Sequence, residues 1–294
     1  MAKREHGAFM QMIVESLKKE RSFALGSMPF IWQIFFFYLP LTCLLSTSLF
    51  KRADYLPILS LSYFIIIKNS LSLAFLTTLC CFCIGFPFAY TIVFRFSRYK
   101  NIFLFLLLLP FWTNFILHIY AWFFVLEKQG FLNNFLLGFG LIQEPIHFLN
   151  TSFATLLMMV YFYLPFMVMP IFASLERFDP KLLEASYDLG ASFSQTLRRI
   201  LIPLTMNGIR AGIFLVYIPS FGEFVIPELM GGNKEFYVGN VISLFVLGEK
   251  TSGVGIAFTV LSLAILILSL LLLHFFLSAI PKFLQGRSVC RSLS

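Results

Sequence analysis

The strongest constraint on this chain is a series of six long apolar stretches, each of a length that can cross a lipid bilayer. A transmembrane helix needs about 20 mostly apolar residues. The stretches run over about Phe30–Phe50, Asn69–Phe94, Asn101–Leu126, Ser152–Leu175, Asn207–Leu229 and Gly253–Ile280. They are continuous rather than alternating, which favours helices over the strands of a membrane barrel. The sequence therefore predicts an all-α polytopic membrane protein with six transmembrane helices.

The composition agrees with this assignment and excludes an ordinary soluble domain. Hydrophobic residues make up 59% of the 294 residues and charged residues only 12%. Soluble domains are about 45–50% apolar and about 25% charged. A water-exposed surface of this size could not be covered by so few charged side chains, and the apolar area left exposed would be too large.

Lysine and arginine residues are unevenly divided between the two sides of the predicted spans. The side that holds both termini carries 15 of the 22 basic residues. Because basic residues accumulate in cytoplasmic loops, both termini are predicted to be cytoplasmic. The resulting division is a cytoplasmic segment at 1–29, a six-span domain at 30–281 and a cytoplasmic tail at 282–294. The net charge of +8 is then mainly a topology signal, and no nucleic-acid-binding module accompanies it.

Motifs for catalysis, nucleotide binding or metal binding do not stand out in the sequence. The four His and five Cys residues lack the spacing of metal ligands. The chain has no phosphate-binding loop and no nucleophile elbow. We therefore expect no metal, no cofactor and no enzymatic activity in this chain.

The predicted cytoplasmic loop at 176–205 carries signals for two short helices separated by a glycine. Asp179 followed by Pro180 is a good start for the first helix, and Gly190 is a good end for it. Ser192 with Gln195 three residues later predicts a capping box for the second helix. Pro203 is expected to mark the turn into the fifth span. A compact helical loop on a membrane protein indicates a docking element rather than a simple connector.

A larger pattern runs through the same loop. It consists of Glu184-Ala185-Ser186, Gly190, Ile200 and Ile202-Pro203 at fixed spacing. This pattern resembles the EAA motif of the permease subunits of ATP-binding-cassette (ABC) importers, with Ser186 in place of the usual alanine and Ile202 in place of leucine. The resemblance implies that the loop couples the spans to an ATPase subunit. The residues that it assigns to this coupling role are Leu182, Glu184, Ala185, Ser186, Gly190, Ile200 and Pro203.

The resemblance extends from about residue 106 to 245. The stretches that carry it are Leu109–Asn114, Ile119–Trp122, Leu164–Pro170 and Ile218–Gly232. They are similar to the permease subunits of spermidine/putrescine importers, although His118 stands where those subunits usually carry arginine. The resemblance implies the type I ABC importer permease (MetI-like) fold, a place in the bacterial inner membrane and polyamine uptake. It also implies three kinds of partner: two ATPase subunits, a second homologous permease and an extracytoplasmic substrate-binding protein.

Charged groups at membrane depth are costly and are therefore candidates for function. Glu223 is predicted to lie inside the fifth span and to attract a cationic substrate, although a buried carboxylate satisfied by other spans, or by Arg210, is the plain alternative. The candidates for the substrate pathway are Glu223, Trp112, Asn114, His118, Tyr120, Tyr217 and Glu228. The candidates for a hinge are Gly222, Pro219 and Pro227.

Two other functions stay open at this point. An ABC permease of this kind could move another small solute, such as thiamine, iron(III), sulfate or a phosphonate. An ion-coupled secondary transporter would need paired ionisable groups along a path, and Glu223 alone is thin support for that class.

Overall fold

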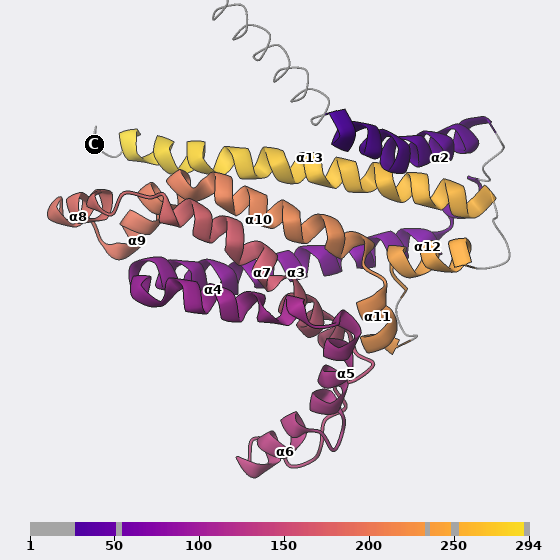
Figure 1. Ribbon diagram of the computed structural model, residues 1–294, viewed down its shortest axis with the longest axis horizontal. Helices are drawn as coiled ribbons and strands as arrows, with labels where there is room; N and C mark the ends of the chain where they lie inside the picture. Colours follow the sequence, from indigo (N-terminus) through magenta and orange to yellow (C-terminus); the bar gives the residue numbers. More distant parts are fainter. Residues whose placement is uncertain (1–26, 51–54, 233–235, 248–252, 291–294) are drawn as a thin grey trace, which may run out of the picture.

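Figure 1 shows the computed structural model, which describes residues 27–50, 55–232, 236–247 and 253–290. Within these ranges every regular element is a helix, as expected. Four long helices lie side by side with nearly parallel axes: α3 (Leu61–Phe94), α7 (Ser152–Glu176), α10 (Ile202–Gly222) and α13 (Gly253–Cys290). The expected N-terminal segment, 1–29, lies almost entirely outside the described residues. The expected tail, 282–294, begins as a continuation of α13.

Shorter helices lie along the sides of this bundle, at its ends or projecting from it (Figure 1). They are α2 (Leu39–Phe50), α4 (Lys100–Leu108), α5 (Phe115–Leu126), α6 (Phe131–Gly138), α8 (Lys181–Asp188), α9 (Phe193–Thr196), α11 (Val225–Met230) and α12 (Val238–Leu247). Helices α8 and α9 lie at the end near the C-terminus, whereas α11 and α12 lie toward the opposite end. Helix α2 packs against α13. The separate helices α6 and α12 were not predicted from the sequence.

The third span, predicted over 101–126, is bent rather than straight. The chain bends by 97° between the helical segments Ser97–Trp112 and Phe115–Gly138. Pro110 lies at the bend and has no N–H to continue the hydrogen-bond ladder, and Asn114 then caps α5 by accepting from the Ile116 N–H at 2.8 Å. Five described helices are long and apolar enough to cross a bilayer, or six when this bent pair counts as one span.

The fifth span begins earlier than predicted. Helical structure is continuous from Phe193 to Gly222, so the expected turn at Pro203 does not exist. A π-helical segment, Leu197–Leu201, comes just before Pro203. Its wider turn accommodates a proline that would strain a regular helix. The second helix of the loop is therefore the first part of the span.

The core is formed where α7 packs between α3 and α10. Its central side chains are apolar and fully buried, among them Met158, Met167, Ile171 and Val216. A second apolar cluster, which includes Ile58, Tyr217 and Phe258, joins α10, α12 and α13. Helices α3, α10 and α13 each take part in both clusters, and α10 packs against α3, α7, α12 and α13.

Candidate functional site

The loop between α7 and α10 folds as the sequence predicts. Asp179 Oδ1 accepts from the Lys181 N–H at 3.0 Å, which caps α8. Gly190 has φ +77°, and the N–H groups of Gly190 and Ala191 donate to the carbonyl oxygens of Tyr187 and Ser186. These two bonds form a Schellman motif, the usual way in which a left-handed glycine ends a helix. The capping box of Ser192 and Gln195 is also present at the start of α9.

Ser186, one of the two positions that depart from the EAA pattern, ties α8 to α9. Its hydroxyl donates to the Leu183 carbonyl oxygen at 3.0 Å and lies 2.8 Å from the Thr196 hydroxyl. Both side chains are buried. The departure therefore adds a polar link between the two helices at a place where alanine would leave only packing.

Replacing Ser186 by alanine is expected to loosen the contact between α8 and α9. A buried hydroxyl that loses its partner costs about 1 to 3 kcal/mol, so the Thr196 hydroxyl would be left with fewer bonds in a buried place. Hydrogen exchange of the backbone amides in 181–196 should become roughly tenfold faster. The exposed Ser194 on α9 is the control, and a Ser194→Ala variant that exchanges as fast as Ser186→Ala would contradict the proposed link.

The rest of α8 faces outward. Leu182, Tyr187 and Leu189 are exposed, Leu189 by 88%, and they alternate with Glu184 and Asp188. Ile200 and Ile202 instead pack against the main core. The helix thus presents an apolar and acidic surface on an anchored base, which is the arrangement expected of a docking element.

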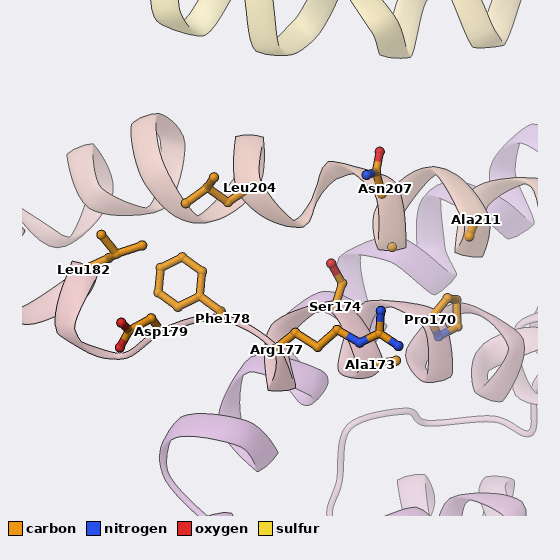
Figure 2. Close-up of a pocket in the computed structure, with 11 residues that line it drawn as sticks. Pro170, Ala173, Ser174, Arg177, Phe178, Asp179, Leu182, Leu204, Asn207 and Ala211 are labelled. Atoms are coloured by element: carbon orange, nitrogen blue, oxygen red, sulfur yellow. The ribbon is translucent and has the colours of Figure 1, made fainter.

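A hollow of about 640 Å³ lies between the end of α7, α8 and α10. Figure 2 shows Phe178, Leu182 and Leu204 at one end of it and Ser174 pointing from α7 toward α10. The lining residues are Pro170, Ala173, Ser174, Arg177, Phe178, Asp179, Leu182, Leu204, Asn207, Gly208 and Ala211. Because α8 supplies part of the wall, a displacement of α8 would change the shape of this hollow.

Glu223 lies at a break in the fifth span, between α10 and α11. Helix α10 ends at Gly222, and Glu223 is extended, with φ −66° and ψ 131°. Had the helix continued, the ring of Pro227 would clash with the carbonyl group of Glu223, four residues earlier. Gly239 packs on this break, since a Cβ atom there would lie 2.5 Å from the Gly222 carbonyl oxygen.

The Glu223 carboxylate is partly buried and has two donors. The Tyr163 hydroxyl on α7 donates to Oε2 at 2.8 Å, and the Val225 N–H donates to Oε1 at 3.0 Å. Arg210 does not reach it, because Arg210 Nη2 donates to the Leu277 carbonyl oxygen on α13 at 3.1 Å. Tyr163 was missed as the partner of Glu223, since no local pattern links residues 60 positions apart.

The other pathway candidates are spread over several places. Glu228 accepts from the side chain of Asn240, and Tyr217 is buried in the second apolar cluster. Trp112 and Tyr120 are exposed. His118 pairs with the Thr113 hydroxyl and has its ring edge-on to Tyr161, 5.8 Å between centroids. Only Glu223 thus combines a charge with a partner from a second long helix.

Two hinge candidates flank the break, and the third lies within a helix. Gly222 ends α10 and has open space around it, while Pro227 is buried in α11. Pro219 lies inside α10. Among the described residues, no group of three His, Cys, Asp or Glu side chains could hold a metal ion.

A bundle of membrane-length helices with a capped helical loop at one end and a broken, carboxylate-bearing span defines an integral membrane protein of the transporter type. The chain belongs to the family described as binding-protein-dependent transport system inner membrane component, whose sequence profile matches residues 81–282. Membership confirms the resemblance to ABC importer permeases and the expected inner-membrane location.

Several relatives of this chain are spermidine/putrescine permeases. The chain is 40% identical to "Spermidine/putrescine transport system permease protein PotB" of Escherichia coli (strain K12) over 255 residues, 83% of this chain and 92% of the relative. The protein of the same name from Haemophilus influenzae is 39% identical over 79% of this chain and 87% of the relative. A shorter match, 34% identical over 40% of this chain and 47% of the relative, is to PotC of H. influenzae.

Solved structures confirm the fold. A crystal structure of a bacterial ABC transporter that imports the acidic polysaccharide alginate has a chain that matches with a TM-score of 0.69 at 19% identity, covering 91% of this chain and 99% of that one. A crystal structure of bacterial alginate ABC transporter with its pentasaccharide-bound periplasmic protein gives 0.71 at 18%, covering 91% and 98%. These matches bear out the all-α, MetI-like permease fold.

Proposed function

We propose that this chain is a permease subunit that forms part of the pathway for polyamine uptake, spermidine and putrescine being the substrates. The observation that carries the proposal is the 40% identity over 83% of the chain to a spermidine/putrescine permease. The chain itself catalyses no reaction, and ATP is hydrolysed on partner subunits. Those partners are two ATPase subunits, a second homologous permease and an extracytoplasmic substrate-binding protein.

In the proposed orientation, both termini and the loop 176–205 lie in the cytoplasm. The basic residues of the loops support this orientation, and α8, α9 and the C-terminus lie at the same end of the bundle (Figure 1). Segment 1–29 and tail 282–294 are then cytoplasmic, and the six spans lie within 30–281.

The loop acts as the coupling element, with α8 seated on an ATPase subunit. Its exposed face consists of Leu182, Glu184, Ala185 and Gly190, and Ile200 and Pro203 connect it to the fifth span. Since helix α9 runs without interruption into α10, a displacement of α8 and α9 is passed directly to the span. It also reaches the hollow in Figure 2, whose wall α8 shares.

Glu223 is the group that attracts the cationic substrate. Its carboxylate lies at a helix break, where irregular backbone is tolerated in a membrane only if it is buried or lines a cavity. One donor is a tyrosine hydroxyl and the other a single backbone N–H, so the carboxylate keeps acceptor capacity for an ammonium group. Nearby aromatic rings add favourable contacts with a cation.

Replacing Glu223 by glutamine is expected to lower spermidine uptake by roughly tenfold, a loss of about 1.4 kcal/mol of interaction with the cation. The measurement is uptake of labelled spermidine and putrescine by cells whose only polyamine importer contains this chain. Tyr163→Phe is the control, because it removes a hydrogen bond to Glu223 but keeps the charge, and its uptake should stay within about threefold of the wild type. Equal uptake by Glu223→Gln and the wild type would remove Glu223 from the pathway.

The same assay separates the alternatives. Uptake of labelled thiamine, sulfate or a phosphonate by the same cells, with no uptake of labelled spermidine or putrescine, would favour another solute for this ABC permease. His118, which stands where the polyamine permeases usually carry arginine, is the observation that keeps this alternative open. Uptake without any ATPase partner would favour an ion-coupled transporter instead.

A further inference from the structure

A second hollow, of about 620 Å³, runs along the outside of the bundle between α3, α10 and α13. We call it the lateral slot. Its lining residues are Phe75, Thr78, Leu79, Phe82, Arg198, Ile202, Met206, Ile209, Ile213, Tyr217, Leu273, Phe276, Leu277 and Ile280. Thirteen of these fourteen side chains carry no charge, and none belongs to the coupling surface of α8 or to the surroundings of Glu223.

The lateral slot has a buried floor and exposed walls. The floor is α10, where Met206, Ile209 and Ile213 are buried. The walls are α3 and α13, where Phe75, Leu79 and Phe276 are exposed. Both wall helices pack on α10, and the hollow lies between them over its apolar face. In a bilayer this face would meet the hydrocarbon interior.

The one charged residue of the lateral slot is at the end near α9. Arg198 lies in the π-helical segment that precedes α10, and its side chain is exposed. Among the residues that the structure describes, Arg198 forms no ion pair; the pair found there joins Lys100 and Glu176. The slot thus has a cationic end at the membrane surface and an apolar length inside the membrane. This arrangement is complementary to an anionic phospholipid, which has a negative headgroup and an apolar acyl chain.

The dimensions agree with a single hydrocarbon chain. From Ile202 to Tyr217 the floor is about 22 Å long at the helical rise of about 1.5 Å per residue. That length exceeds half of the roughly 30 Å hydrocarbon core, which is the depth of one leaflet. The hollow of about 620 Å³ extends along this floor and is therefore elongated in the direction of the helix axis.

We propose that the lateral slot binds one acyl chain of an anionic phospholipid, with its phosphate group at Arg198. The acyl chain covers the apolar floor of α10, and the charge-assisted hydrogen bonds of the guanidinium group select the anionic headgroup. Because α10 continues from the coupling loop, the bound lipid braces that helix between α3 and α13. The orientation that places Arg198 at the cytoplasmic leaflet rests on the proposed function, but the site itself does not.

The test is lipid retention by the whole transporter, purified with its partner subunits and exchanged into nanodiscs of phosphatidylglycerol and phosphatidylcholine. Native mass spectrometry of the released complex counts the lipids that stay bound. Wild-type protein should retain phosphatidylglycerol at least about fivefold more than phosphatidylcholine. Arg198→Gln should remove that preference and Arg198→Lys should restore most of it. Arg199→Gln, a neighbouring arginine that does not line the slot, should behave as the wild type.

A second pair of variants tests the apolar part of the slot. Leu79 and Leu76 lie on α3 and are each 45% exposed, but only Leu79 lines the slot. Leu79→Trp should fill it and lower retention of both lipids, whereas Leu76→Trp should not. In brominated phospholipid the fluorescence of the tryptophan introduced by Leu79→Trp should also be quenched. Absence of quenching in that variant is expected if a helix of another subunit covers the slot, and it would overturn the proposal. Equal retention of phosphatidylglycerol by Arg198→Gln and Arg199→Gln would also overturn it. None of these readouts depends on which solute is transported.

Discussion

Replacing Gly208 by leucine is expected to push α7 away from α10 and to lower the heat stability of the transporter strongly. A Cβ atom at this position would lie 2.5 Å from the Pro170 carbonyl oxygen and 2.5 Å from the Ser174 Cβ atom. One turn later, a Cβ atom at Gly212 would lie 3.0 Å from the Met167 carbonyl oxygen. These contacts involve backbone atoms, so the whole helix would have to move.

Small residues four positions apart allow membrane helices to approach closely, and the approach is stabilised mainly by packing. Overpacking a well-filled site costs about 1–3 kcal/mol even when side chains can adjust, and here they cannot. We therefore expect at least about 3 kcal/mol of destabilisation, and more for Leu than for Ala.

The measurement for this prediction is the fraction of purified transporter that remains monodisperse after heating. Gly138→Leu is the matched control, because Gly138 lies at the end of α6 and a Cβ atom there has no neighbour within 4 Å. Gly208→Leu should lose most of its monodisperse fraction at a temperature at which Gly138→Leu and the wild type remain intact. Equal heat resistance of the two leucine variants would mean that α7 and α10 do not pack as closely as described.

Local signals in the sequence were sufficient for the coupling loop. The caps at Asp179, Gly190 and Ser192 involve hydrogen bonds between residues at most five positions apart, so the residue types and their spacing determine them. Each of these three caps is present in the structure. The same reasoning failed at Pro203, because a π-helical segment absorbs the proline and the helix continues.

Apolar length predicted where the spans lie but not where they break. Hydropathy does not register the loss of a backbone donor at Pro110 or the clash that Pro227 would cause, so on its own it shows neither the bend in the third span nor the break in the fifth. The prolines themselves were the available signal. In the same way, the spacing of Gly208 and Gly212 in the sequence indicates a close helix contact, although it does not identify α7 as the partner.

Contacts between distant segments set the limit of the sequence analysis. The bond from Tyr163 to Glu223 joins two helices whose order in the bundle follows from packing and not from any local pattern. The pairing of Arg210 with the Leu277 carbonyl oxygen is of the same kind. The sequence could therefore identify Glu223 as a costly charge in the membrane, but only the fold shows which groups satisfy it.

Replacing Gly190 by valine is expected to abolish uptake while leaving the membrane domain folded. Gly190 has φ +77° and open space around it. A valine side chain would therefore meet no neighbour, but the backbone of valine strongly disfavours this left-handed conformation. The left-handed conformation costs an ordinary residue about 1–2 kcal/mol, and a β-branched residue is a genuine outlier there. The end of α8 would unwind or turn differently, and its exposed surface would no longer match the ATPase subunit. We expect uptake to fall at least about tenfold and the ATPase subunits to be lost on purification.

Two further variants separate this explanation from a general effect of strain. Gly190→Asn should keep most of the activity, because asparagine tolerates the left-handed conformation. Gly140→Val introduces the same strain at φ +67°, also in open space, but in the segment after α6 and not in the coupling loop. If Gly140→Val also lost its ATPase subunits, or if Gly190→Val kept them, the loop would not be the docking element. Loss of the ATPase subunits only from Gly190→Val would support the docking role of the loop. The Schellman motif at Gly190 sets the direction in which the chain leaves α8 and enters the helix that becomes the fifth span, so the conformation of this one residue would account for the loss.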